Sequence, residues 1–211
     1  MELLKGFKHL HHASIKIERD KVIYIDPFQI EGSPHDADII FCTHEHFDHL
    51  NPEAIGKVMK GDTVIVVPKD NVKKVKKHGF KDVIGVEPNQ SYEADGIPFK
   101  TVPAYNLDKK FHKRKENWVG YILTLEGTTY YFAGDTDYIP EMDSIKADVV
   151  FIPVGGTYTC TAQEAAAAVN SIKPKVAVPI HFGSIVGNQG DAETFIKNLA
   201  PGIEGVILTF R

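Results

Sequence analysis

Cysteine is scarce in this sequence, and long apolar runs are missing from it. Cys42 and Cys160 are the only cysteines among 211 residues, too few for a disulfide framework, so we expect a reducing compartment. No apolar stretch approaches the roughly 20 residues that a membrane-spanning helix needs, and the first residues lack the cationic and apolar segments of a signal peptide. We therefore expect a cytoplasmic protein that has no membrane partner.

A strong charge of one sign is also missing. The formal net charge is −4 at pH 7, and the basic cluster at residues 112–115 is short and local. Because proteins hold nucleic acids mainly through many lysine and arginine contacts to phosphates, this balance gives no reason to expect nucleic-acid binding. We expect a small-molecule substrate instead, and we leave open whether the chain forms an oligomer.

Two common catalytic signatures are absent as well. The sequence has no Gly-x-Ser-x-Gly segment, which places the nucleophile of many serine hydrolases. It also has neither a Gly-x-Gly-x-x-Gly segment nor a phosphate-binding P-loop. A serine-hydrolase mechanism is therefore unsupported.

What the sequence does contain is a series of short β-branched or aromatic runs, each ending in a turn or a polar cluster. These runs predict strands at residues 21–25, 38–42, 63–67, 82–86, 97–102, 119–124, 129–133, 148–152, 175–180 and 205–210.

Helices are fewer and mostly short. Asn51 is placed as the N-cap of a helix to about residue 59, and the lysine-rich segment 70–78 stops at a glycine. Thr161 begins a capping box ahead of an alanine-rich helix to about residue 172, and Asp191 is expected to cap a last helix. This mixture predicts an α/β chain of two sheets with helices outside them, in a single domain of residues 1–211.

The strongest local signal is His44-Glu45-His46-Phe47-Asp48-His49, directly after the predicted strand 38–42. On an extended backbone, alternate side chains point the same way, so His44, His46 and Asp48 can converge. Imidazole and carboxylate groups are ligands that suit zinc and neighbouring divalent metals. A solvated histidine-rich turn is the alternative, but four candidate ligands within six residues favour a metal site.

Other polar clusters also follow predicted strands directly. Asp26 follows one strand, residues 134–137 and 155–156 follow two more, and His181 follows a fourth. Where strands run parallel, their carboxyl ends share one edge of the sheet, and binding sites form there. These junctions predict one site assembled from distant segments of the chain.

The motif at residues 44–49 resembles the His-x-His-x-Asp-His motif of the metallo-β-lactamase superfamily. The segments at 134–136 and 179–183 resemble those that supply the family's bridging aspartate and its last histidine. Residues 12–14 and 25–27 resemble the branch that contains ascorbate-6-phosphate lactonase-like and related hydrolases. The resemblance spans nearly the whole chain and implies a four-layer αβ/βα sandwich, the metallo-hydrolase/oxidoreductase fold, with metals at one edge.

The resemblance also implies the ligands of two divalent ions, with zinc as the first candidate and manganese as the second. The first ion would be bound by His44 and His46, and Asp135 would bridge to the second. The second ion would be bound by Asp48, His49 and His181.

One expected family ligand has no direct match. The family normally has a histidine after the strand predicted at 97–102, where this chain has Pro103-Ala104-Tyr105-Asn106. Asn106 is a poor zinc ligand, so either His112 folds back into the position, or the first site is completed by water or left weak. His78 is a weaker candidate, because the dipole of a helix explains a histidine at its C-terminus.

Three residues are candidate catalytic groups beside this metal site: Asp48, Asp26 and His12. Asp26 could simply form a turn before Pro27. The resemblance instead makes it an acceptor that orients a ligating imidazole. His12 is either a polar strand start or a group at the pocket rim that positions substrate or protonates a leaving group.

These residues predict a metal-dependent hydrolase in which a hydroxide held by the metals cleaves a small ester, lactone or phosphoester. Residues 113–115 with Trp118 form either a solvated loop or a flap that attracts an anionic substrate. Two alternatives remain: a non-enzymatic or weakly metallated metal-binding domain, and a phosphodiesterase or nuclease.

Overall fold

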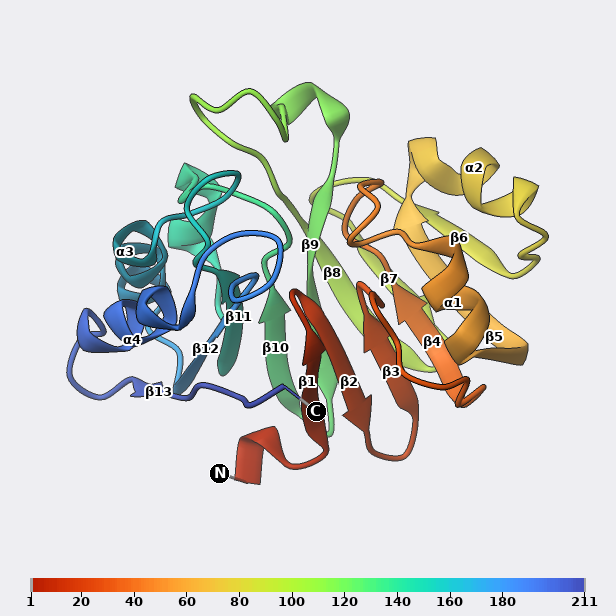
Figure 1. Cartoon of the computed structure of the whole chain (residues 1–211), viewed down its shortest axis with the longest axis horizontal. Coiled ribbons are helices and arrows are strands. Elements are labelled where there is room, and N and C mark those ends of the chain that lie inside the picture. The colour runs from red at the N-terminus through yellow and green to blue at the C-terminus, as the bar shows by residue number, and fades with distance from the viewer. Residues whose placement is uncertain (1, 211) are drawn as a thin grey trace.

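The computed structural model describes residues 2–210, so Met1 and Arg211, the two ends of the predicted domain, lie outside the described residues. Two mixed sheets face each other in the middle of the molecule, and helices cover the outer face of each sheet (Figure 1). This arrangement confirms the predicted α/β sandwich. Within residues 2–210, no helix is both long enough and apolar enough to cross a membrane.

The N-terminal sheet has its strands in chain order, from β1 to β6. The first three strands are antiparallel, and β3 to β6 run parallel. Their bounds are β1 Phe7–His11, β2 Ser14–Glu18, β3 Val22–Ile25, β4 Ala37–Phe41, β5 Met59–Pro68 and β6 Val83–Val86. The helices beside this sheet are η1 Glu2–Leu4, α1 Pro52–Val58, η2 Lys69–Asn71 and α2 Val72–Lys77.

The C-terminal sheet has the order β13-β12-β11-β10-β9-β8-β7. Strands β7 to β10 are antiparallel, and β10 to β13 run parallel. Their bounds are β7 Ser91–Ala94, β8 Ile97–Pro103, β9 Val119–Leu125, β10 Thr128–Phe132, β11 Val149–Pro153, β12 Val176–Ile180 and β13 Glu204–Gly205. The helices beside this sheet are η3 Arg114–Glu116, η4 Pro140–Ser144, α3 Ala162–Ile172 and α4 Gln189–Lys197.

Alternation along the strands divides the core into three apolar layers. In β4, Ile39 and Phe41 face the other sheet, while Ile40 faces α1 and α2. The Phe41 ring lies 5.1 Å from Phe99 and 5.0 Å from Tyr121, both in the opposite sheet. A separate layer joins the outer face of the C-terminal sheet to α3 and α4. Burial of these apolar faces holds the sheets together and fixes the two strand edges beside each other.

The structure confirms most of the predicted elements and corrects two of them. The strand expected at 205–210 is wrong, because only Glu204–Gly205 forms a ladder with β12. Residues 206–208 are partly buried and pack against the core. The Val206 N–H still donates to the Ala177 carbonyl of β12, but these residues form no strand, so their apolar character reflects burial. The last helix is capped by Asn188 and not by Asp191, whose carboxylate instead accepts a hydrogen bond from the Asn188 backbone N–H.

Other predicted features match closely. The Asn51 side chain accepts a hydrogen bond from the Ala54 backbone N–H and caps α1 as expected. Thr161 forms the predicted capping box of α3. The pattern missed β1, β2 and β7. The first two of these form a hairpin whose turn reaches the strand edge where the polar clusters lie.

Candidate metal centre

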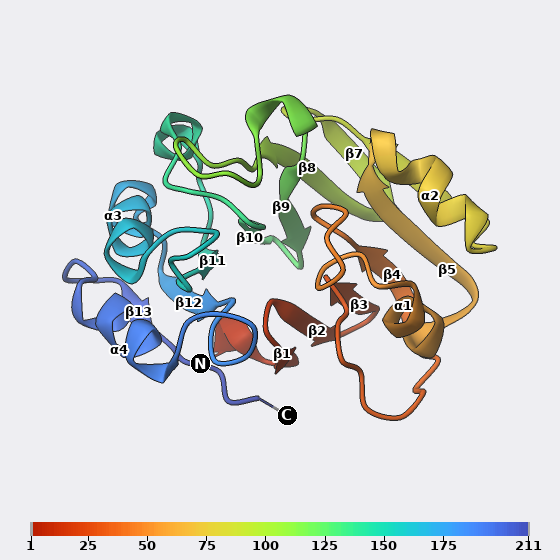
Figure 2. The same cartoon turned by 45° about the horizontal axis from the view of Figure 1, so that its top comes forward.

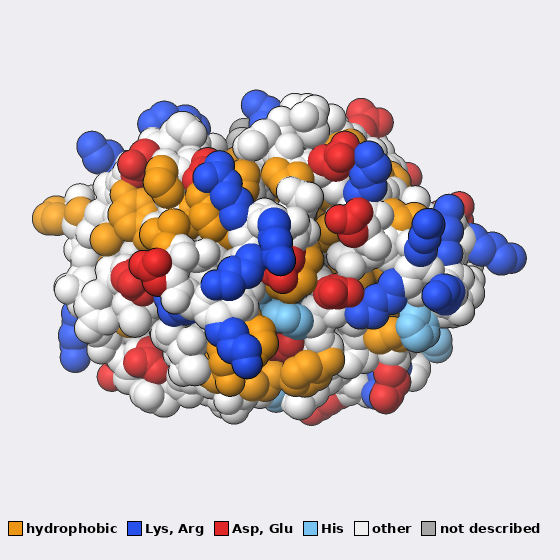
Figure 3. All heavy atoms as spheres, turned by 90° about the horizontal axis from the view of Figure 1, so that it is seen from above, with side chains coloured by type: hydrophobic (Ala, Val, Ile, Leu, Met, Phe, Trp, Pro, Cys, Tyr) orange, Lys and Arg blue, Asp and Glu red, His pale blue; other side chains and the backbone are white. Residues whose placement is uncertain are grey.

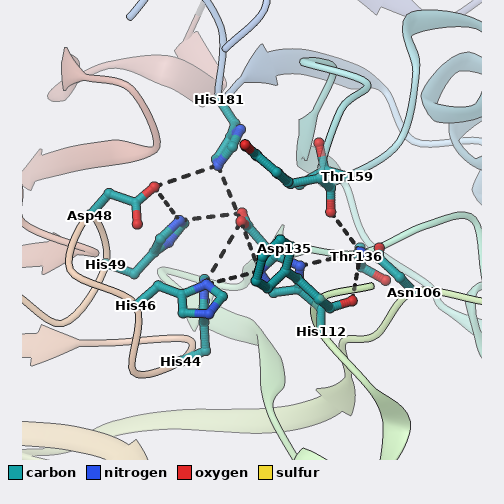
Figure 4. Close-up of polar contacts among 12 residues, drawn as sticks. His44, His46, Asp48, His49, Asn106, His112, Asp135, Thr136, Thr159 and His181 are labelled. Carbon is teal, nitrogen blue, oxygen red and sulfur yellow. Dashed lines mark hydrogen bonds and ion pairs between the residues drawn. The ribbon is translucent and has the colours of Figure 1, made fainter. Parts of the chain in front are cut away.

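The polar clusters that follow separate strands meet at one edge of the two sheets. Figure 2 shows the loops after β4, β8, β10 and β12 lying together over this edge. The motif 44–49 follows β4, Asp135 follows β10, and His181 follows β12. Figure 4 shows the side chains from these segments pointing toward one another. The predicted assembly of one site from distant strand ends is therefore present.

The first cluster consists of three imidazoles. The His44 Nε2 atom and the His112 Nε2 atom each lie 3.1 Å from His46 Nδ1. One nitrogen from each ring lies within 4.8 Å of the others. His44 and His112 are buried, whereas His46 is partly exposed. Three imidazole nitrogens with one open side match a catalytic metal site that keeps a position for water or substrate.

The second cluster consists of His12, Asp48, His49 and His181, all of them buried. Asp48 Oδ2 lies 3.3 Å from His12 Nε2, 3.6 Å from His49 Nε2 and 3.9 Å from His181 Nε2. Among residues 2–210, neither ring nitrogen of His12 or His181 has a hydrogen-bond partner. Buried polar atoms are costly when unpaired, and a divalent cation would compensate them. The residues of both clusters therefore fit metal ions.

Asp135 lies between the two clusters. Its Oδ1 atom is 3.3 Å from His49 Nε2 in the second cluster. Its Oδ2 atom is 3.2 Å from His112 Nε2 in the first cluster and 3.1 Å from His181 Nε2 in the second. The Asp135 carboxylate therefore lies within 3.3 Å of imidazole nitrogens from both clusters.

Asp26 and Thr43 form the layer behind these rings. Asp26 accepts hydrogen bonds from the Thr43 N–H at 2.7 Å, the Thr43 hydroxyl at 2.8 Å and His49 Nδ1 at 2.7 Å. Because the Thr43 proton goes to the carboxylate, its oxygen is left to accept from His44 Nδ1 at 3.0 Å. Both rings then carry their proton on Nδ1 and turn an unprotonated Nε2 toward the clusters. Asp26 thus accepts a hydrogen bond from the His49 imidazole, which is the contact that the resemblance implies for it.

The electrostatics differ among the donors: His44, His46 and His12 favour the neutral form, Asp48 and Asp135 favour the ionised form, and Asp135 and Asp26 raise the pKa of His49 well above its usual value against the effect of burial. Burial lowers the pKa of His44 and of His46, and neighbouring histidines lower it further. Burial lowers the pKa of His12 to about 4, against the opposing effect of Asp48. Burial alone would raise the pKa of Asp135, but His181 and His49 outweigh it and hold that pKa well below its usual range. Metal binding requires neutral imidazoles and ionised carboxylates, so an ion bound by His49 would displace a proton from that ring.

The structure brings His112, and not Asn106, into the first cluster. Asn106 is buried behind it, where its backbone N–H donates to the His112 carbonyl at 2.7 Å. The Asn106 amide nitrogen donates to the Tyr158 carbonyl at 2.6 Å and to the Phe111 carbonyl at 3.1 Å. Asn106 therefore holds the loop that presents His112. The sequence left open whether His112 folds back into this position, because loop closure is not visible in local spacing.

His12 lies deeper than the rim position considered from the sequence. Its side chain is buried at the second cluster, with its ring centroid 3.7 Å from that of His181. His78 lies at the exposed C-terminus of α2, outside both clusters. Arg114 is exposed and forms a 2.8 Å ion pair with Glu141, as expected for a solvated loop.

Thr43 was not singled out from the sequence, and Trp118 was considered only as part of a loop or flap. Thr43 links Asp26 to His44, and the signal that could have found it is a hydroxyl residue directly before the motif. Trp118 is buried with its ring 4.8 Å from His44 and 4.9 Å from His46. It forms an apolar wall that limits water around the first cluster.

Comparisons with known proteins identify relatives of this chain. A family model described as a beta-lactamase superfamily domain matches residues 7–181. The UPF0173 metal-dependent hydrolase of Pyrococcus abyssi is 32% identical over 216 residues, covering 95% of each chain. Its counterpart in Thermococcus kodakarensis is 33% identical over 215 residues, again covering 95% of each chain. The crystal structure of a protein from Parabacteroides distasonis, also described as a metal-dependent hydrolase, superposes with a TM-score of 0.82 at 33% identity, covering 97% of this chain and 93% of that one.

The matches extend over almost the whole chain and include every segment that contributes to the two clusters. The sequence resemblance, the two-sheet architecture and the named relatives all indicate the same family. The chain therefore belongs to the metallo-β-lactamase superfamily, among relatives named as metal-dependent hydrolases.

Proposed function

We propose that this protein is a hydrolase that binds two divalent ions at the paired clusters. His44, His46 and His112 would hold the first ion, Asp48, His49 and His181 the second, and Asp135 would contact both. The observation that carries this proposal is the position of the Asp135 carboxylate, within 3.3 Å of donors in both clusters. A buried carboxylate surrounded by imidazoles is otherwise hard to account for in an apolar core.

When bound, the two ions would supply an activated water near neutral pH and polarise the substrate oxygen. The chain's own groups set the conditions for this chemistry. Asp26 and Thr43 keep the His44 and His49 rings in the ligating tautomer. Asp135 stays ionised because of its histidine neighbours, and Trp118 keeps bulk water from the first cluster.

The surroundings of the site support a small substrate with an apolar part. Large apolar side chains are exposed beside the clusters: Phe47 is 64% exposed, Phe111 42% and Tyr158 37%. The Phe111 ring lies 6.2 Å from His46 and 5.6 Å from Tyr158. Figure 3, looking onto this edge, shows a histidine surrounded by apolar and cationic side chains. We propose a carboxylic ester or lactone first, with a phosphoester as the next candidate.

The test is to measure metal content and turnover together. We expect about two ions per chain, as in other two-metal hydrolases, with turnover of ester, lactone or phosphodiester substrates that a chelator abolishes and added metal restores. Asp135→Asn should lose most of the bound metal and all detectable turnover, because it removes the shared anionic ligand. Exchanging the exposed His78 for Asn, well away from both clusters, is the matched control. Full metal content and full activity in Asp135→Asn would overturn the proposal.

The non-enzymatic alternative rested on a missing ligand in the first site. The position of His112, 3.1 Å from His46, removes that reason. Failure of every substrate class with two ions bound would favour the alternative again, and turnover limited to phosphodiesters would favour the phosphodiesterase.

A further inference from the structure

We propose that His12 is an additional protein ligand of the second ion, which makes that site six-coordinate and suited to Mn²⁺ or Fe²⁺ more than to Zn²⁺. This inference rests on the proposed two-ion function. It assigns His12 a role different from substrate positioning or leaving-group protonation, and it makes the two metal sites chemically unequal.

The first argument is the surroundings of the His12 ring. The residue is 0% exposed, and neither ring nitrogen has a hydrogen-bond partner among residues 2–210. Its Nε2 atom lies 3.3 Å from Asp48 Oδ2, and its ring lies 3.7 Å from the His181 ring. One donor atom from each of His12, Asp48, His49 and His181 falls within a 4.8 Å group. The imidazole therefore faces the other donors of the second cluster.

The second argument is the backbone that holds the ring there. His12 has φ +52°, a left-handed conformation in the turn between β1 and β2, where Gly or Asn would cost less. Its carbonyl accepts hydrogen bonds from the His181 N–H at 2.9 Å and from His9 Nε2 at 2.6 Å. The turn is thus fastened to the end of β12. A turn alone does not require an imidazole at a strained position, whereas a ligand at a fixed place does.

The third argument is the number of donors. Together with Asp135, the second cluster offers three imidazoles and two carboxylates, and the distances between a carboxylate oxygen and a neighbouring imidazole nitrogen run from 3.1 Å to 3.9 Å. Ligands about 2.1 Å from a metal lie about 3 Å apart when adjacent in an octahedron and about 4.2 Å apart when opposite. Zinc prefers four ligands and seldom exceeds five, while Mn²⁺ and Fe²⁺ commonly take six. Five protein donors plus one water match the latter.

The first cluster differs in this respect. Its three imidazoles and the shared Asp135 give four protein donors, a number that suits zinc. The structure thus points to two different metal ions: a four-coordinate ion such as Zn²⁺ at the first cluster, and a six-coordinate ion such as Mn²⁺ or Fe²⁺ at the second.

The experiment uses His12→Asn, because asparagine tolerates the left-handed backbone but is too short to reach the other donors. His11→Asn, in the same hairpin but outside both clusters, is the control. Metal-free protein is titrated with Mn²⁺, and the free ion is measured by electron paramagnetic resonance. We expect His12→Asn to weaken Mn²⁺ binding by more than about 10-fold, the lower bound seen for loss of residues that merely support metal ligands. Zinc binding at the first site should change little.

A second readout needs no variant. Protein loaded with Co²⁺ at both sites should give intense visible absorption from the first site and weak absorption, typical of six-coordinate cobalt, from the second. In His12→Asn the second contribution should strengthen as coordination falls. Unchanged Mn²⁺ affinity in His12→Asn, or equally intense cobalt bands from both wild-type sites, would overturn the role of His12 while leaving the hydrolase proposal intact. Wild-type protein that binds no ion would overturn both.

Discussion

The two histidine clusters of this protein differ in how they are built. The first is assembled from two loops, the motif after β4 and the segment that carries His112, and its His46 is partly exposed. The second is buried throughout and draws on the β1–β2 turn, the motif and the end of β12. A site on the surface loops can exchange water and substrate, whereas a site among strand ends is fixed by the fold. From this difference we expect the first cluster to exchange water and substrate, and the second to hold its donors at positions that the fold fixes.

The closed cluster also joins the two sheets directly. The His12 carbonyl in the N-terminal sheet accepts from the His181 N–H in the C-terminal sheet at 2.9 Å. Asp135 extends this link from the end of β10 to His49. We therefore expect ion loss from the second site to loosen the sheet edge, and ion loss from the first site to affect chiefly turnover.

The largest expected effect that separates the clusters comes from His112→Ala. The change removes one of three imidazoles from the open site and none from the closed site. We expect kcat/KM to fall by more than the roughly 100-fold typical of residues that only support metal ligands, with one ion still tightly bound and little change in melting temperature. Metal analysis after dialysis, kinetics and thermal unfolding check this, with His78→Ala as the control. Loss of both ions would show that the clusters are not separable.

A smaller effect, shared by both clusters, is expected from Asp26→Asn. Asp26 orients His49 directly and His44 through Thr43, so one substitution disturbs a ring in each site. We expect metal affinity at both sites to fall by about 10- to 100-fold. Thr43→Val should lower the metal affinity of the first site only, because it removes the contact to His44 while the hydrogen bond from His49 to Asp26 remains. If Asp26→Asn left the metal affinity of either site unchanged, Asp26 would not support both sites.

The smallest effect is expected far from both clusters, at Asp148. Its carboxylate accepts from the Thr129 N–H at 3.0 Å and from Lys175 Nζ at 2.8 Å. Lys175 and the Thr129 backbone lower the Asp148 pKa from 3.8 to about 2. A lowered carboxyl pKa stabilises the fold above pH 3.8, and this stabilisation is lost as the pH falls toward 2.

We therefore expect Asp148→Asn to lower the free energy of unfolding at pH 7 by about 1 kcal/mol, with less difference from wild type at pH 3. Urea unfolding at the two pH values measures this, and metal content should not change. A difference that stays constant between pH 7 and pH 3 would remove the assigned role of the Asp148 charge.

Much of the layered fold could be predicted from the sequence, because a buried face gives a local pattern of apolar residues. Alternation assigns Ile39 and Phe41 to one face of β4 and Ile40 to the other, and the cap at Asn51 marks the start of α1. This prediction failed at residues 206–208, where an apolar run is partly buried without forming a strand. Hydrophobicity reports that a residue is covered, but it does not report which backbone group it pairs with.

The sequence by itself determined the type of chemistry, because three imidazoles and a carboxylate packed into residues 44–49 have few other uses than holding metal. Only the tertiary structure decided which distant residues complete the two clusters. His112 reaches the first through a loop held by Asn106, and His12 reaches the second through a strained turn fastened to His181. Such placements depend on loop closure and on two sheets packing face to face, and neither leaves a periodic signal in the chain.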